Sequence, residues 1–208
     1  MKPKLIIIEG SQGVGKGAIT TLLREKIPYS TLMRLSGIKD NTKETGLDKV
    51  YKLRSNELAF ILNCANLNTT FILDRCHLSE KVYCNLGYKK YDFKTETKAL
   101  NGYLNILTDF YDVYIIGLIL EDTDIYVKRL ERDKAIFEHS KFNIDNSIRQ
   151  QNEYIKEITN IKNEYKNIKC LLVDNSTSPE DTLKLISDFC GLEIQLWQQQ
   201  KEKTHLIK

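Results

Sequence analysis

Gly10, Gly15 and Lys16 have the spacing G-x-x-x-x-G-K, which is typical of a loop that binds nucleotide phosphates. Glycines let backbone N–H groups curl around an anion without a Cβ in the way. The lysine carries a point charge that can reach the outer phosphates. We therefore expect the phosphates to be bound by Gly10, Ser11, Gln12, Gly13, Val14, Gly15, Lys16, Gly17 and Ala18.

The loop departs from the usual pattern at one position. A serine or threonine normally follows the lysine, and its hydroxyl binds Mg²⁺, but here Gly17 and Ala18 follow. The hydroxyls of Thr20 and Thr21 lie a turn further along the chain, which is too far to substitute. The sequence therefore predicts that Mg²⁺ is held by nucleotide oxygens, water and a carboxylate from elsewhere in the chain.

Asp74 is the candidate for that carboxylate, because it directly follows the apolar run 70–73, which predicts a buried strand. It is placed to bind the metal directly or through water, and Arg75 beside it can clamp a phosphoryl group. The alternative for this pair is a helix cap with a surface ion pair. Arg34, near the end of a predicted strand at 30–35, is either a phosphate ligand or a surface arginine.

The elements that must position these residues alternate between strands and helices. Apolar runs predict five strands, at 5–8, 30–35, 70–73, 113–120 and 168–173. Helical spacing and capping residues predict helices at 18–26, 48–66, 79–85, 94–110, 121–132, 144–165 and 179–190. This alternation predicts an α/β fold, in which a five-stranded parallel sheet carries helices on both faces. We expect a single domain over residues 1–208.

Two stretches lack a clear period. Residues 133–146 are polar and follow Arg129 and Arg132, so they predict a small lid. Residues 192–208 are rich in glutamine and lysine, and they are either a helical extension or a loose tail. Neither stretch has the composition of a linker between domains.

Composition indicates a globular protein, with 41% hydrophobic and 28% charged residues. The net charge of +3 is small and basic residues are interleaved with acidic ones, so we expect no nucleic-acid partner. No apolar run is long enough to span a bilayer, and the N-terminus lacks the features of a signal peptide. We therefore expect a cytoplasmic protein that has no membrane partner.

The segment 74–83 resembles thymidylate kinases and their relatives among virus-type deoxynucleotide kinases. That family has D-R at a strand end, a serine five residues after the aspartate and an aromatic residue nine after it. Asp74, Arg75, Ser79 and Tyr83 match this pattern. The family's phosphate loop begins with E-G after an apolar strand, as the loop does here. The resemblance implies a P-loop NTPase fold with a sheet ordered 2-3-1-4-5 and a mobile lid.

The resemblance also implies roles for individual residues. Arg75 would bind the phosphate of the acceptor nucleotide, and Asp74 would serve the metal and its waters. Tyr83 would lie against the deoxyribose, and Arg129 or Arg132 would stabilise charge on the transferring phosphoryl group. The implied substrate contacts are Gln12, Arg34, Arg75, Ser79 and Tyr83, and the implied catalytic residues are Lys16, Asp74, Arg75, Arg129 and Arg132.

The chain departs from thymidylate kinases where the base and sugar are read. Those enzymes usually carry aspartate where Gln12 stands, and they use it near the sugar hydroxyl. They also have a phenylalanine and an arginine on the second helix that read thymine. Neither residue is in register around 62–67. The phosphoryl-transfer interpretation is unaffected, whereas thymine specificity does not follow from this sequence.

We therefore expect a nucleoside monophosphate kinase that uses ATP and Mg²⁺ and accepts dTMP or a related nucleotide. Such an acceptor is already anionic and needs no strong general base. The alternative is a deoxynucleoside kinase; that class uses a glutamate just after the second strand, and none closely follows Arg34. A GTP-binding switch would need an N-K-x-D motif, which is absent, and Gly17 leaves a non-catalytic nucleotide-binding module open. A homodimer is also left open.

Overall fold

The structure, a computed structural model, describes residues 2–35, 42–136 and 143–192. Within them, five strands form a parallel sheet with the order β2-β3-β1-β4-β5. The strands are β1 (Lys4–Gly10), β2 (Ser30–Met33), β3 (Thr70–Asp74), β4 (Asp112–Ile119) and β5 (Lys169–Asp174). The predicted fold class and strand order are therefore confirmed.

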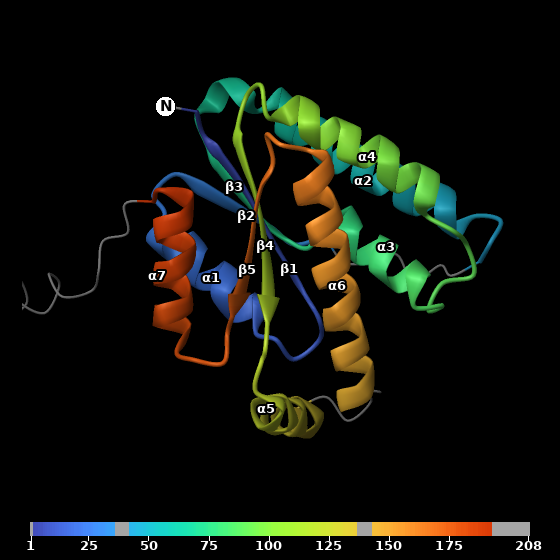
Figure 1. The fold of residues 1–208 in the computed structure, drawn as a ribbon. Coiled ribbons are helices and arrows are strands. Elements are labelled where there is room, and N and C mark those ends of the chain that lie inside the picture. Colours follow the sequence, from blue (N-terminus) through green and yellow to red (C-terminus); the bar gives the residue numbers. More distant parts are fainter. Residues whose placement is uncertain (1, 36–41, 137–142, 193–208) are drawn as a thin grey trace, which may run out of the picture.

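Helices cover both faces of the sheet, as predicted. They are α1 (Lys16–Lys26), α2 (Gly46–Asn63), α3 (His77–Asn85), α4 (Lys94–Leu107), α5 (Thr123–Ile136), α6 (Ile144–Glu164) and α7 (Pro179–Cys190), with a 3₁₀ turn at Ala65–Leu67. In Figure 1, α1 and α7 cover one face, α2, α3, α4 and α6 cover the other, and α5 lies beyond the carboxyl ends of the strands. None of these described helices is both long enough and apolar enough to cross a membrane.

The central strand β1 is apolar on both sides because helices bury both faces of the sheet. Successive side chains of a strand point to opposite faces. Accordingly, Leu5 and Ile7 join the core beneath α2, α4 and α6, while Ile6 and Ile8 join the core beneath α1 and α7. Ile8 is in register with Asp74 of β3. The loop after β1 and the residues after β3 therefore meet at the same edge of the sheet.

Several element boundaries differ from the prediction by one to four residues, and at two of them the reason lies outside the local sequence. β2 ends at Met33, two residues early, because its pairing with β3, its single neighbour in the sheet, ends there. α3 begins at His77, two residues early, because Glu9 from β1 supports its start. The Glu9 carboxylate accepts a hydrogen bond from the backbone N–H of Cys76, the N-cap residue, at 2.7 Å.

Helix α7 begins and ends at its predicted signals. The Ser178 hydroxyl accepts the N–H of Asp181 at 3.1 Å, and Pro179 is the first helical residue. Gly191 ends the helix in the left-handed conformation, with φ of 59°. These signals are local, which is why the sequence alone was enough to place this helix.

The predicted lid and tail are described only in part. α5 extends to Ile136 and α6 begins at Ile144, so both ends of the predicted lid segment 133–146 are helical. Residues 137–142, between these helices, lie outside the described residues, as do 193–208 of the predicted tail. The lid and the single-domain assignment stay predictions.

Gly117 in β4 is expected to be required by close packing between the sheet and α6. A Cβ there would lie 2.6 Å from Ile158 Cδ1 and 2.7 Å from Leu172 Cδ2. Gly117→Ala should therefore lower the free energy of unfolding by about 1–3 kcal/mol, measured by urea denaturation. The matched control is Gly102→Ala in α4, where a Cβ meets nothing within 4 Å. That change should raise stability by about 0.5–1 kcal/mol, and equal effects of the two changes would contradict the packing argument.

Candidate functional site

The loop between β1 and α1 has the backbone of an anion-binding site. Gly10 has φ of 145°, and a Cβ on it would lie 2.6 Å from the carbonyl oxygen of Leu118, so a larger residue does not fit. Gly15 is the N-cap of α1, and no side chain caps this helix start. Unbonded N–H groups at a helix N-terminus attract anions. The predicted phosphate loop is therefore present as a strand–loop–helix unit.

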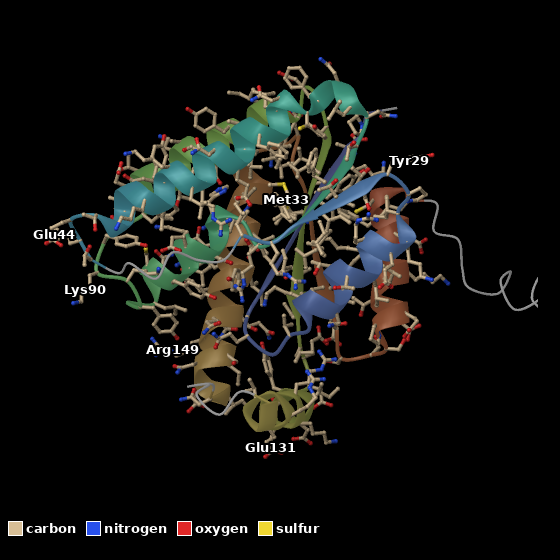
Figure 2. The ribbon with its side chains drawn as sticks, turned by 180° about the vertical axis from the view of Figure 1, so that it is seen from behind. Tyr29, Met33, Glu44, Lys90, Glu131 and Arg149 are labelled. Carbon is tan, nitrogen blue, oxygen red and sulfur yellow. The ribbon has the colours of Figure 1, made fainter. Side chains whose placement is uncertain are left out.

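Two helices hold the first half of this loop. The Ser11 hydroxyl is hydrogen-bonded to the hydroxyl of Tyr126 from α5. The backbone N–H of Gln12 donates to Gln150 Oε1 from α6 at 3.3 Å. In Figure 2, α5 (labelled at Glu131) and α6 lie next to this edge of the sheet. The two contacts join residues 115 and 138 positions apart in the chain, and no local sequence pattern indicates them.

The second half of the loop is held through the carbonyl oxygen of Val14. Asn175 Nδ2 donates to this oxygen at 2.7 Å, and Arg129 Nη1 donates to it at 3.1 Å. Arg129 Nη2 also donates to the backbone carbonyl of Asn175 at 2.7 Å. Thr182 Oγ1 donates to Asn175 Oδ1 at 2.7 Å, which orients the Asn175 amide. Arg129 thus supports the loop in this structure; its predicted role in phosphoryl transfer, like that of the exposed Arg132, stays a prediction.

Lys16 lies in the loop as predicted. Its Nζ donates to the Ser11 carbonyl at 2.6 Å, and the residue is 8% exposed. Burial lowers the pKa of Lys16 well below its usual value; nearby Arg75 lowers it further, while Asp74 and Glu9 raise it. An anionic phosphate beside this ammonium would favour its charged form.

Asp74 and Arg34 are brought together at the ends of β3 and β2. Arg34 Nε lies 2.6 Å from Asp74 Oδ2, and Arg34 Nη2 donates to Thr20 Oγ1 of α1 at 3.2 Å. Arg34 is thus exposed but not isolated on the surface, since its guanidinium contacts the carboxylate beside the phosphate loop. Its role as a phosphate ligand stays a prediction. Met33, labelled in Figure 2, is the last residue of β2 before this arginine.

The side chains around Asp74 do not form the magnesium site that is usual beside a phosphate loop. Asp74 Oδ2 is already paired with Arg34, and Gly17 has no side-chain hydroxyl. In the described ranges no three His, Cys, Asp or Glu side chains are grouped to hold a metal ion. The role of Asp74 as a metal ligand stays a prediction, as does Mg²⁺ held by nucleotide oxygens and water.

Arg75 is held in a strained conformation at the start of α3. Its φ is 77°, a left-handed value that is unusual for arginine and is found most often at functional sites. Its Nη1 donates to Ser79 Oγ at 3.0 Å and to the Tyr154 hydroxyl at 2.7 Å, and its guanidinium lies 5.8 Å from the Tyr83 ring centroid. Three of the predicted residues therefore form one cluster, to which α6 adds Tyr154.

Charge is retained in this cluster although it is partly buried. Burial alone would lower the pKa of Arg75, but Tyr154, Tyr83, Glu9 and Asp74 raise it overall. The Glu9 carboxylate also accepts from Ser79 Oγ at 2.8 Å. Glu9 was noticed in the sequence only as part of the E-G pattern, and its role in placing α3 was missed.

Arg75→Ala is expected to lower kcat/KM for the phosphate acceptor roughly a hundredfold or more. A charge-assisted arginine contact is worth on the order of 3 kcal/mol, and an arginine bound in both ground and transition states supplies binding and orientation together. Arg75→Lys should recover only part of this, because a point charge lacks the planar fork. Steady-state kinetics measure both variants. Tyr154→Phe, which removes one partner of Arg75, is the control; an equal loss in that variant would mean that Arg75 acts mainly through structure.

A buried ion pair lies on α2, which covers the same face of the sheet as α3. Arg54 Nη1 donates to Glu57 Oε2 at 2.9 Å, and both residues are under 5% exposed. Glu57 Oε1 has no hydrogen-bond partner within the described part of the chain. Burial raises the pKa of Glu57, Arg54 lowers it and Glu9 raises it. The sequence interpretation missed this pair, because two charged residues three apart on a helix usually indicate a solvated face.

His77, one residue beyond the α3 cap, is buried and is expected to make stability depend on pH. Its Nε2 is 2.7 Å from Asn101 Oδ1, and burial lowers its pKa from 6.5 to about 4, an effect that the Asn101 contact opposes. The unfolded chain therefore takes up a proton near pH 6.5, whereas the folded chain does so only near pH 4. The contribution of neutral His77 to the free energy of unfolding is fully present above pH 6.5. It decreases by on the order of 3 kcal/mol as the pH falls to 4.

His77→Gln tests this assignment, since glutamine keeps a hydrogen-bonding group without a titration in this range. Urea unfolding at several pH values should show a shallower decrease in the free energy of unfolding between pH 6.5 and 4 for the variant. Parallel curves for the wild type and the variant would show that other groups cause the pH dependence.

Comparison with known proteins bears on the fold. No protein-family model matches this sequence, and no curated protein matches it. Among solved structures, deoxyadenosine kinase from M. mycoides, with dCMP and a flexible dCDP bound, is 18% identical with a TM-score of 0.56. That match covers 88% of this chain and 97% of the kinase. This chain has the fold of P-loop kinases.

Two further structures agree with this result. The same kinase with bound dATP is 18% identical, covering 90% of this chain and 98% of the kinase, with a TM-score of 0.51. A tunicamycin resistance protein from Deinococcus radiodurans is 15% identical, covering 94% and 99%, with a TM-score of 0.52. At such identities the likeness shows the fold alone. The resemblance to thymidylate kinases in particular, and the homodimer, stay predictions.

Proposed function

We propose that this chain is a kinase that transfers the terminal phosphoryl group of ATP to the 5′-hydroxyl of a deoxynucleoside. The proposal reverses the order of the two functions expected from the sequence. The observation that carries it is the placement of Asp74, in register with Ile8 near the end of β1 and followed directly by Arg75, beside the phosphate loop. Its fold-level support is the match to deoxyadenosine kinase over almost the whole of that protein.

In this proposal, the residues around the loop have separate roles in phosphoryl transfer. The loop N–H groups and Lys16 hold the outer phosphates of ATP and carry the charge that develops on them. Arg75 binds the transferring phosphoryl group or the acceptor's 5′ end through its planar fork. Tyr83, whose ring centroid is 5.8 Å from the Arg75 guanidinium, packs against the sugar of the acceptor. Positioning and charge neutralisation account for most of the catalysis in this type of reaction.

Asp74 supplies the general base that a hydroxyl acceptor needs. The carboxylate is 9% exposed, and Arg34 contacts it through Oδ2, which leaves Oδ1 to accept the proton of the 5′-hydroxyl. A base in hydrogen-bonding reach of the proton it removes is the geometric requirement for this role. The missing glutamate after β2 is therefore no obstacle to nucleoside phosphorylation.

A nucleoside monophosphate is the second candidate acceptor. It is favoured by the same ion pair, because Arg34 occupies one oxygen of the Asp74 carboxylate and so leaves less of that carboxylate to accept a hydroxyl proton. An anionic phosphate acceptor would not require that base. dTMP or a related deoxynucleotide, the acceptor expected from the sequence, belongs to this candidate.

A panel of acceptors separates the two candidates. The purified chain would be assayed for ADP formation from ATP with the four common deoxynucleosides and their 5′-monophosphates. We expect at least one deoxynucleoside to have a kcat/KM greater than that of its own monophosphate. A preference for the monophosphate in every pair would overturn the proposal in favour of the second candidate. ADP formation that no acceptor stimulates would overturn both.

A further inference from the structure

Arg34 reaches across the edge of the sheet to the start of α1. Its Nε contacts Asp74 Oδ2 at 2.6 Å, and its Nη2 donates to Thr20 Oγ1 at 3.2 Å. Thr20 is itself fixed, since Oγ1 donates to the carbonyl oxygen of Gly17 at 3.2 Å. The guanidinium is thus oriented by α1 and β3 together, although the side chain is 54% exposed.

The guanidinium lies next to the position whose hydroxyl usually binds the metal of a phosphate loop. A Cβ built on Gly17 would be 3.7 Å from Arg34 Nη2, in ordinary van der Waals contact. Position 17 is where the hydroxyl that binds Mg²⁺ normally stands. A serine side chain at this position would therefore lie against the Arg34 guanidinium.

The Asp74 carboxylate is paired with the Arg34 guanidinium, which lies next to Gly17, and this pairing disfavours a metal ion bound by the protein at the same position. Mg²⁺ requires oxygen ligands in near-octahedral geometry, and Arg34 already contacts one oxygen of Asp74. A divalent ion between Asp74 and Gly17 would also be repelled by the guanidinium, because both carry positive charge. Within the described residues, Asp74 and Thr20 take two of its five N–H donors, and the other three are available to phosphate oxygens.

We propose that the guanidinium of Arg34 takes the place of the metal ion that a phosphate loop usually binds through its hydroxyl. The chain therefore binds ATP with little dependence on divalent metal, through the loop N–H groups, Lys16 and Arg34. The absence of a hydroxyl at Gly17 and the ion pair with Asp74 are then parts of one arrangement. This inference rests on the proposed binding of ATP at the loop.

Calorimetric titration with ATP tests the inference, in EDTA and in excess MgCl₂. For the wild type we expect dissociation constants that agree within about threefold. Arg34→Gln should weaken binding in EDTA by roughly tenfold or more, the size expected for losing a charge-assisted contact, and should weaken it less in MgCl₂. Arg24→Gln, which changes an exposed arginine on the same helix as Gly17, is the matched control and should leave both constants unchanged.

Restoring the hydroxyl gives a second test. Gly17→Ser in the Arg34→Gln background should bind ATP roughly tenfold or more tightly in MgCl₂ than in EDTA, because both the oxygen ligand and the space for the ion are then present. Circular dichroism would establish that each variant is folded. Gly17→Ser with Arg34 retained should keep the wild-type independence of metal.

The outcomes separate this inference from the proposed function. Wild-type binding more than threefold tighter in MgCl₂, or metal-free binding unaffected by Arg34→Gln, would overturn the inference while leaving an active kinase possible in the acceptor assay. Metal-independent ATP binding without any transfer to an acceptor would overturn the proposed function alone. A failure of ATP to bind in either buffer would overturn both.

Discussion

Asp74→Asn is expected to lower kcat for deoxynucleoside phosphorylation by roughly 10²- to 10⁴-fold, the usual contribution of a general base. Asparagine has nearly the same shape as aspartate but cannot take up the proton of the 5′-hydroxyl. KM for the deoxynucleoside should change much less, because the acceptor's sugar and base contact other residues. Steady-state kinetics at saturating ATP measure both constants.

The matched control is Asp112→Asn at the start of β4. Asp112 is also ion-paired, since Lys169 Nζ lies 3.3 Å from its Oδ1. It lies at the amino ends of the strands, whereas the phosphate loop lies at their carboxyl ends. Its replacement should leave kcat unchanged. If Asp74→Asn also retained wild-type kcat on a deoxynucleoside, Asp74 would not be the base, and the monophosphate acceptor would be the better interpretation.

Lys16→Ala is expected to abolish measurable turnover while the fold remains intact. A preorganised donor of this kind is commonly worth a factor of roughly 10² to 10³ in kcat, and Lys16 also contributes to phosphate binding. The buried Nζ has the Ser11 carbonyl as its hydrogen-bond acceptor, so removing it perturbs the loop locally rather than the core. Kinetics and circular dichroism together measure the effect.

Lys4→Ala provides the control for Lys16→Ala. Lys4 is 9% exposed, similar to Lys16, but it lies at the amino end of β1, where its Nζ is 5.9 Å from the ring centroid of Tyr114. This variant should lose some stability and keep its kcat. A folded Lys16→Ala protein with wild-type kcat would exclude the loop as the site of phosphoryl transfer.

The sequence predicted most of the fold because its signals are local. The apolar run of β4 and the caps of α7 are each contained in a few neighbouring residues, and both elements are confirmed. The phosphate loop is equally local, since one strand, one turn and one helix suffice to place Lys16. Boundaries that depend on other elements were wrong by two residues, as at α3, where Glu9 of β1 supports the helix start.

The candidate site was harder to predict because much of it is assembled over long distances. Tyr154 of α6 contacts Arg75, 79 positions away in the chain, and Asn175 contacts Val14 from 161 positions away. No spacing rule connects such residues, since their contact depends on how α6 and β5 pack against the sheet. The partner of Arg34 could not be predicted either, because it depends on β2 and β3 being neighbours in the sheet.

Following the phosphoryl group itself shows directly which acceptor the chain phosphorylates. The purified chain would be incubated with ATP labelled in its γ-phosphate and with an equimolar mixture of a deoxynucleoside and its 5′-monophosphate, and the products would be separated by chromatography. We expect the label to appear first in the deoxynucleoside 5′-monophosphate. Label that appears first in the diphosphate, with none in the monophosphate, would contradict it.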